Sequence, residues 1–323
     1  MRLVPLVFAL ACLAAEAAAD ARAAVEGHVL PRIEALATAG AGLSDAAGAS
    51  CAPDALRPAF AEAADAWAAA SHLTLGPGEE GGRFRAISFW PDDKDAAGRG
   101  LRLLRAQGPD AWTLEGIARA SVAARGLTAL ERLIEEGDPE ADCPLVRALA
   151  ADLAATTAAV RDGWTGPDGF ARMIETAGAP GNARFLSEGE ASAALYTALM
   201  TGLEFDADQR LKRPLGTFDR PRPQRAEMRR SGRSLANLSA SLASLREFAG
   251  LLADAPRTGA ALAHAEELAA RLDDPALAGV ADPQGRIRVE ALYTAVEEAK
   301  DVAATEIGTA LGVPAGFNSL DGD

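Results

Sequence analysis

Hydrophobic positions along most of this chain recur at intervals of three and four residues. One such stripe in the region 224–252 consists of Leu235, Leu238, Leu242, Leu245, Phe248 and Leu252. This period places apolar side chains on one face of an α-helix that packs against neighbouring helices. The pattern therefore predicts a long helix over 224–252, and the alternation typical of strands is rare elsewhere.

The same periodicity predicts helices along nearly the whole chain, with sequence signals at their ends. Ser187 and Glu190 form a capping box that opens a helix, and Gly76-Pro77-Gly78 ends another. The expected helices span 22–43, 54–72, 96–106, 110–136, 144–164, 169–176, 187–210, 224–252, 258–272 and 287–311.

Composition supports an all-α fold. Hydrophobic residues make up 49% of the 323 residues but aromatic residues only 5%, so alanine and leucine, both strong helix formers, carry most of the core. Short connections between amphipathic helices favour antiparallel bundles. A glycine-rich passage at 167–183 is expected to link an N-terminal bundle over 20–166 to a C-terminal bundle over 184–323.

The first residues have the pattern of a targeting segment. Arg2 precedes an uncharged apolar run at 3–15, and Ala17-Ala18-Ala19 matches the A-x-A cleavage signature. We expect 1–19 to be a signal peptide and the product to reach the periplasm or cell envelope. Lipid attachment at Cys12 is the alternative. No later run holds about 18 uninterrupted apolar residues, so no transmembrane segment is expected.

The expected export determines whether the remaining cysteines can form a disulfide. Cys51 and Cys143 are the two cysteines after the expected cleavage site. Two thiols in an oxidising compartment most simply form one disulfide. Closing so long a loop would stabilise the fold by about 4 kcal/mol in the chain-entropy account. Two separate buried thiols are the alternative.

Charge and motifs exclude several classes of function. The formal net charge of −14 disfavours a nucleic-acid binder or a protein that docks on anionic lipid. The sequence contains neither the H-E-x-x-H motif of zinc proteases nor a P-loop nor a G-x-S-x-G elbow. His264 and Glu267 share a helix face, but a solvated face is the simpler interpretation. His28 and His72 are isolated in the sequence and are expected to be structural.

Glu131 is the first candidate for chemistry. Thr128 and Glu131 lie one turn apart on the same face of the helix predicted over 110–136. Gly126 would lie inside that helix, where glycine is costly unless close packing requires it. Glu131 could equally pair with an arginine at the surface.

Several separated segments together resemble the imelysin family, whose members are also called imelysin-like peptidases. They are Phe60 to Trp67 followed by Gly76-Pro77, Phe89-Trp90-Pro91-Asp92, Gly126 to Glu131 continuing to Cys143, Arg229 to Leu235, and Gly316 to Asp323. These segments extend over nearly the whole chain that follows the predicted signal peptide. It is their order and spacing that make the match specific.

The resemblance implies two helical bundles, side by side and related by duplication, in an exported bacterial protein associated with iron uptake. The family signature G-x-H-x-x-E, a proposed metal site, corresponds here to Gly126, Thr128 and Glu131. Threonine replaces the histidine and is a poor metal ligand, although ferric iron accepts several converging carboxylates. The carboxylates that other segments could supply are those of Asp92, Glu204, Asp206 and Asp321.

Four arginines extend the candidate site. Arg225, Arg229, Arg230 and Arg233 cluster at the start of the helix expected over 224–252. Arg225, Arg229 and Arg233 are spaced four residues apart and would share one face of that helix. Such a basic stripe could bind an anionic group through paired hydrogen bonds. Alternatively, these arginines neutralise Asp92, Glu131 or Asp321 across the interface between the bundles.

The sequence thus predicts an exported binding protein of iron acquisition that captures iron or an iron chelate between the bundles. We expect Glu131, Asp92 and Asp321 to be metal ligands. The ligand-binding residues expected beside them are Thr128, Trp90, Arg230, Arg233 and Asn318. The alternatives are an envelope scaffold that binds a partner protein, and a metallopeptidase, which would need a metal with an open position and a general base.

Overall fold

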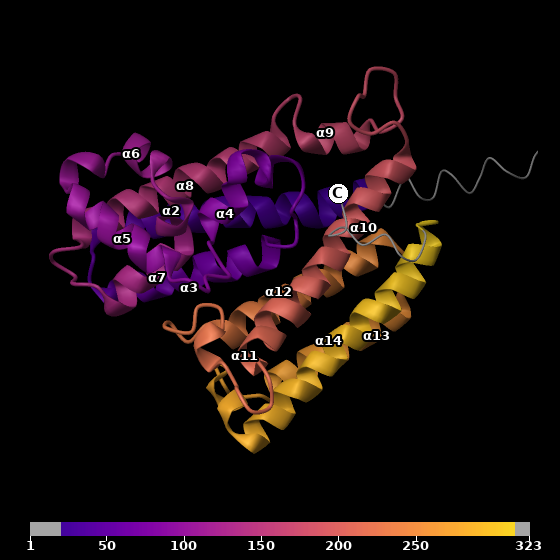
Figure 1. Ribbon diagram of the computed structural model, residues 1–323. Helices are drawn as coiled ribbons and strands as arrows, with labels where there is room; N and C mark the ends of the chain where they lie inside the picture. The colour runs from indigo at the N-terminus through magenta and orange to yellow at the C-terminus, as the bar shows by residue number, and fades with distance from the viewer. Residues whose placement is uncertain (1–20, 314–323) are drawn as a thin grey trace, which may run out of the picture.

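The computed structural model describes residues 21–313, and this part of the chain is helical (Figure 1). Its α-helices are α2 (Leu30–Ala49), α3 (Pro53–Ala70), α4 (Arg83–Ile87), α5 (Ala96–Gln107), α6 (Leu114–Arg119), α7 (Gly126–Glu136), α8 (Cys143–Thr165), α9 (Phe170–Glu175), α10 (Glu188–Glu204), α11 (Arg213–Leu215), α12 (Ser234–Leu252), α13 (Pro256–Ala270) and α14 (Pro283–Ala310). Within 21–313 the β-structure is limited to one isolated bridge between Thr217 and Arg220. The predicted all-α class is confirmed.

The helices form two packed groups that meet at an angle (Figure 1). In the N-terminal half, α2 packs along α3 and α8, and α7 packs on α3 and α8. In the C-terminal half, α12, α13 and α14 pack in sequence order, with α10 against α12 and α14. Because α12 also packs against α3, one hydrophobic core runs through both halves.

The leucine stripe predicted for the C-terminal half is the buried face of α12. Leu238, Leu242, Leu245 and Phe248 are fully buried, and Leu252 is nearly so. Fully burying one such side chain contributes roughly 1.5–3 kcal/mol, so these positions hold α12 in place between α3 and α13.

The predicted helix over 110–136 is wrong in its first half. The chain there forms the short helix α6, turns, and begins α7 only at Gly126. Gly126 has a φ of 65°, and a Cβ atom at this position would lie 2.2 Å from the carbonyl oxygens of Ala86 and Ile87. Glycine is required here because the chain both turns left-handed and touches backbone, and not because it packs inside a helix.

The predicted helix over 224–252 also starts too early. Residues 226–233 form turns, with φ of 44° at Met228 and 67° at Gly232, and α12 begins at Ser234. Pro221 and Pro223 precede these turns. The clustered arginines therefore lie on an irregular segment, and their helical spacing in the sequence does not place them on one helix face.

The predicted disulfide is confirmed. Cys51, just after α2, is bonded to Cys143, the first residue of α8, with an S–S distance of 2.01 Å. The bond joins positions 92 residues apart, so it ties the end of α2 to the helix that packs along it.

Some predictions concern residues that the structure does not describe. The signal peptide over 1–19 and Cys12 lie outside the described residues, as do Asn318 and Asp321. The boundary proposed at 167–183 contains α9 and the connection to α10, and it stays a prediction.

One part of the described chain, Cys143–Glu175, is long and apolar enough by length and composition to cross a membrane. A buried core helix passes the same test. In this structure α8 packs along α2, with Leu149 and Leu153 buried between them and other helices.

Candidate functional site

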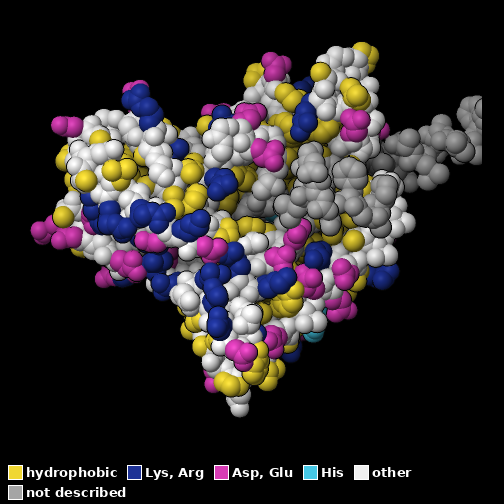
Figure 2. All heavy atoms as spheres, in the orientation of Figure 1, with side chains coloured by type: hydrophobic (Ala, Val, Ile, Leu, Met, Phe, Trp, Pro, Cys, Tyr) yellow, Lys and Arg dark blue, Asp and Glu magenta, His cyan; other side chains and the backbone are white. Residues whose placement is uncertain are grey.

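A cavity of about 340 Å³ lies between the two halves. The N-terminal half contributes side chains from residues 90–95 and the face of α7 that carries Thr128 and Glu131. The C-terminal half contributes Arg213 and side chains from residues 222–230. Figure 2 shows Lys and Arg side chains gathered on this face of the molecule, along the space between α5 and α11. The cavity has the size of a small-molecule pocket, which typically encloses ~300–1,000 Å³.

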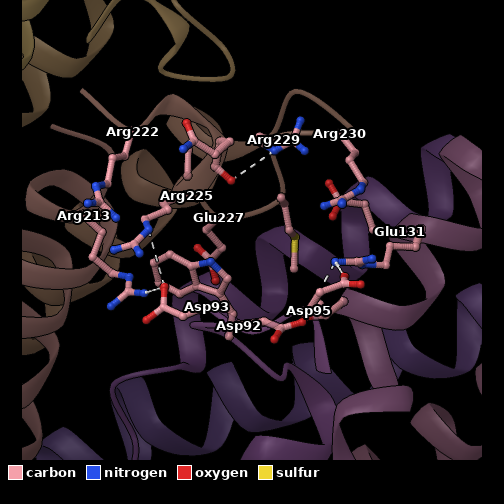
Figure 3. A pocket seen from close by; sticks show the side chains of 16 residues that line it. Asp92, Asp93, Asp95, Glu131, Arg213, Arg222, Arg225, Glu227, Arg229 and Arg230 are labelled. Atoms are coloured by element: carbon pink, nitrogen blue, oxygen red, sulfur yellow. Dashed lines mark hydrogen bonds and ion pairs between the residues drawn. The ribbon is translucent and has the colours of Figure 1, made fainter. Parts of the chain in front are cut away.

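Charged side chains dominate the walls of the cavity. Its arginines are Arg132, Arg213, Arg222, Arg225, Arg229 and Arg230. Its carboxylates are Asp92, Asp93, Asp95, Glu131 and Glu227. In Figure 3 the arginines of the C-terminal half lie above the aspartates that precede α5. The cavity is therefore more basic than the protein as a whole, whose net charge is −14.

Glu131 connects the two halves. It lies on α7 with 3% of its surface exposed, and its Oε1 accepts hydrogen bonds from the backbone N–H of Ser231 (3.0 Å) and from the Ser231 hydroxyl (2.9 Å). Burial raises the pKa of Glu131, while the Ser231 hydrogen bonds and the charge of Arg230 act in the opposite direction. The predicted alternative, in which an arginine neutralises Glu131, is thus only partly correct, because a serine makes the direct contacts.

Asp92 has a structural role at the start of α5. Its two carboxylate oxygens accept the backbone N–H groups of Ala96 (2.7 Å) and Ala97 (2.9 Å). Arg132 lies 4.0 Å from the same carboxylate. These bonds satisfy N–H groups that a helix start leaves unpaired, so both oxygens of Asp92 are already engaged.

Asp93 holds two of the cavity's arginines in place. It forms ion pairs with Arg213 and with Arg225, the latter at 3.6 Å. The hydrogen bond from Arg213 is the main reason that the pKa of Asp93 lies below its ordinary value. Asp93 in this way fixes two arginines of the C-terminal half onto the N-terminal half.

The remaining predicted site residues divide between the cavity and its surroundings. Trp90 and Thr128 line the cavity, and Arg213 lies over the Trp90 ring at 6.0 Å. Arg230 lines it too, while its Nε donates to Glu136 at 2.8 Å. Arg233 does not line the cavity and instead forms an ion pair with Asp65 of α3.

Carboxylates do not converge on a metal position among residues 21–313, where no group of three or more His, Cys, Asp or Glu side chains could hold an ion. Asp206 is buried and bonded to Arg210 at 2.5 Å, and burial raises its pKa to about 6. Glu204 does not line the cavity. The described residues therefore do not form the carboxylate set that would bind a bare ferric ion.

The sequence profile of the family described as Imelysin (Peptidase M75) matches residues 29–303. The chain belongs to the imelysin family. An imelysin-like protein from Psychrobacter arcticum 273-4 is similar in structure, with a TM-score of 0.79 and 21% sequence identity, covering 98% of this chain and 100% of that chain.

A second solved structure is also similar to this imelysin-family protein. It is a protein from Parabacteroides distasonis ATCC 8503 provisionally named an iron-regulated protein A precursor. The TM-score is 0.69 at 11% identity, covering 90% of this chain and 95% of that chain. At these identities both structures establish the fold alone. No curated protein sequence matches this chain.

Several residues of the imelysin cavity were not predicted. Arg213 and Arg222 belong to the proline-rich segment 213–223, which the sequence marks only as a loop. A usable signal was present, because that loop carries three arginines in an acidic chain. Arg210 was also missed: it is fully buried behind the cavity, and its Nε donates to Glu227 at 2.8 Å.

His28 and His72, which are isolated in the sequence, lie together in the structure. Their Nε2 atoms lie 3.1 Å apart in the interior, where the ring of Phe248 stacks on His28. Burial lowers the pKa of His28 to about 4 and that of His72 well below its ordinary value, so both rings are neutral at pH 7. They lie where the residues before α2, the end of α3 and Phe248 of α12 meet, and they do not line the cavity.

Proposed function

We propose that this imelysin-family protein is an exported envelope protein of bacterial iron acquisition, and that it holds its ligand in the cavity between the two halves. The mechanism is capture and not turnover. The observation that carries the proposal is the cavity itself, where Trp90, Thr128, Glu131 and Arg230 meet although they are distant in the sequence.

The contacts in the cavity favour iron in complexed form over a bare ion. Asp92 uses both of its oxygens on backbone N–H groups, and Asp93 is paired with two arginines. Glu131 has one oxygen on Ser231 and can offer the other. A single carboxylate oxygen and the Thr128 hydroxyl are too few ligands for a ferric ion, which takes several oxygen ligands.

Two further observations support the location and the link with iron. The segment 1–19 has the pattern of a cleavable signal, and the disulfide between Cys51 and Cys143 fits an oxidising compartment. A protein of the same fold carries a name that refers to iron regulation. The link with iron enters the proposal through that name and through the family.

Retention of iron tests this function. The purified protein is incubated with radioactive iron, supplied either as ferric citrate or as ferric nitrilotriacetate, and separated from free iron by gel filtration. We expect iron to elute with the protein. A Thr128→Trp variant fills the cavity and should lose the iron, whereas Thr294→Trp, at an exposed position of α14, should keep it.

Two results would overturn the proposal. One is the absence of retained iron with either complex, which would favour the alternative of an envelope scaffold. The other is equal retention by the Thr128→Trp variant, which would place the iron elsewhere. Matching thermal unfolding midpoints of the two tryptophan variants would show that the difference does not come from misfolding.

A further inference from the structure

Two arginines in the cavity lack the carboxylate partner that the others have. Arg213 and Arg225 pair with Asp93, Arg132 pairs with Asp95 at 2.7 Å, and Arg230 pairs with Glu136. For Arg222 and Arg229, no carboxylate among residues 21–313 lies within 4.0 Å. In a chain with 46 acidic and 32 basic residues, guanidinium groups left without partners in a concave site are unexpected.

The two arginines are held in place by backbone contacts that leave their terminal nitrogens available. The Nε of Arg229 donates to the carbonyl oxygen of Gln224 at 3.2 Å, and both of its terminal NH₂ groups stay without a partner in the described chain. The backbone N–H of Arg222 donates to the carbonyl oxygen of Pro214 at 2.8 Å, which anchors the residue to the end of α11. Each guanidinium can therefore offer paired N–H donors to an oxyanion.

The positions of the two arginines indicate the form of the ligand. In Figure 3, Arg222 lies beside Arg213 and Arg225 at one end of the cavity, and Arg229 lies beside Arg230 at the other end. A single compact anion such as phosphate would reach one end at a time. A ligand with several separated carboxylates can satisfy both ends.

We propose that the cavity recognises a polycarboxylate, the metal-binding part of an anionic iron chelate, through Arg222 and Arg229. This inference rests on the proposed function and names the class of its ligand. The carboxylates of the ligand lie toward the arginines of the C-terminal half. On the opposite wall, the arginines that face Asp93 and Asp95 are already paired with them, which leaves Arg222 and Arg229 as the cations available to the ligand.

Citrate without metal is the direct probe, because it tests the arginines independently of iron. Calorimetric titration should show saturable citrate binding to the wild-type protein. The Arg222→Gln and Arg229→Gln variants should each bind citrate about 10-fold more weakly, because each loses a charge-assisted hydrogen bond to a carboxylate, and tenfold in affinity corresponds to about 1.4 kcal/mol. Arg271→Gln, which removes an exposed ion pair at the end of α13 and does not line the cavity, should bind as the wild type does.

The outcomes separate this inference from the proposed function. Iron retention that is indifferent to citrate and to both glutamine variants would overturn the polycarboxylate and leave iron capture standing. Arginine-dependent citrate binding without retention of iron would support the inference and overturn iron capture. Inorganic phosphate that competes as well as citrate would overturn the requirement for several carboxylates. Unchanged unfolding midpoints of both variants would show that the fold is intact.

Discussion

Removing the Glu131 side chain should destabilise the protein, because this carboxylate braces one half against the other. In a Glu131→Ala variant the backbone N–H of Ser231 loses its acceptor, and the Ser231 hydroxyl keeps only the carbonyl oxygen of Met228 at 3.1 Å. A donor left unpaired in a partly buried place costs roughly 1–3 kcal/mol, and the relief of a desolvated carboxylate offsets part of that loss. The net expected loss is about 1–3 kcal/mol of unfolding free energy.

Chemical denaturation at pH 7 measures this loss, with a control one turn along the same helix. Glu136 pairs with Arg230 at the surface, where such a bridge is worth roughly 0–1 kcal/mol, so Glu136→Ala should change little. A double-mutant cycle with Ser231→Ala should yield a coupling of about 1–2 kcal/mol between Glu131 and Ser231, because the two residues are in direct contact.

The reasoning about Glu131 would be refuted by a Glu131→Ala variant as stable as Glu136→Ala. Zero coupling with Ser231 would refute it as well, even if the single variants were unstable. If Glu131→Ala kept its stability but lost all retention of iron, Glu131 would act as a metal ligand and not as a brace.

Three further predictions concern stability. Replacing Cys51 and Cys143 together by alanine should cost about 4–5 kcal/mol in chemical denaturation, since the bond closes a loop of 92 residues, and a loss under 1 kcal/mol would contradict this. Arg210→Met should cost about 3–5 kcal/mol because two buried carboxylates lose their cation, and its unfolding midpoint should fall far below that of Arg271→Met. The folded-state pKa of His28, about 4 against 6.5 when unfolded, means that the unfolded chain takes up the proton first as pH falls. Wild-type stability should therefore drop by about 3 kcal/mol between pH 6.5 and 4 relative to His28→Gln, and parallel stability curves for the two proteins would disprove it.

The helical architecture could be predicted because its signals are local and repeated. The stripe of α12 specifies both a helix and its buried face, and the burial of Leu238 to Leu252 follows from spacing alone. The disulfide could be predicted from two facts alone, the expected export to an oxidising compartment and the presence of two cysteines after the cleavage site. The predictions failed where they extended a single helix through Gly126 and through 226–233, because turns with positive φ interrupt the chain at both places.

The candidate site could be predicted only in part, because contacts between distant segments create it. Trp90, Thr128, Glu131 and Arg230 were predicted from local spacing, charge and the family resemblance, and all four line the cavity. The bonds that occupy Asp92 depend on the turn before α5, which no motif marks. No motif predicts the contact between His28 and His72 either. Their Nε2 atoms are 3.1 Å apart although the residues are 44 positions apart in the sequence.

The most direct test of the account is a crystal structure of the protein soaked with ferric citrate, with anomalous scattering measured at the iron edge. The account predicts one iron peak inside the cavity, with carboxylates of the ligand within hydrogen-bond distance of Arg222 and Arg229. An iron peak outside the cavity, or a fully occupied ligand elsewhere on the protein, would contradict it.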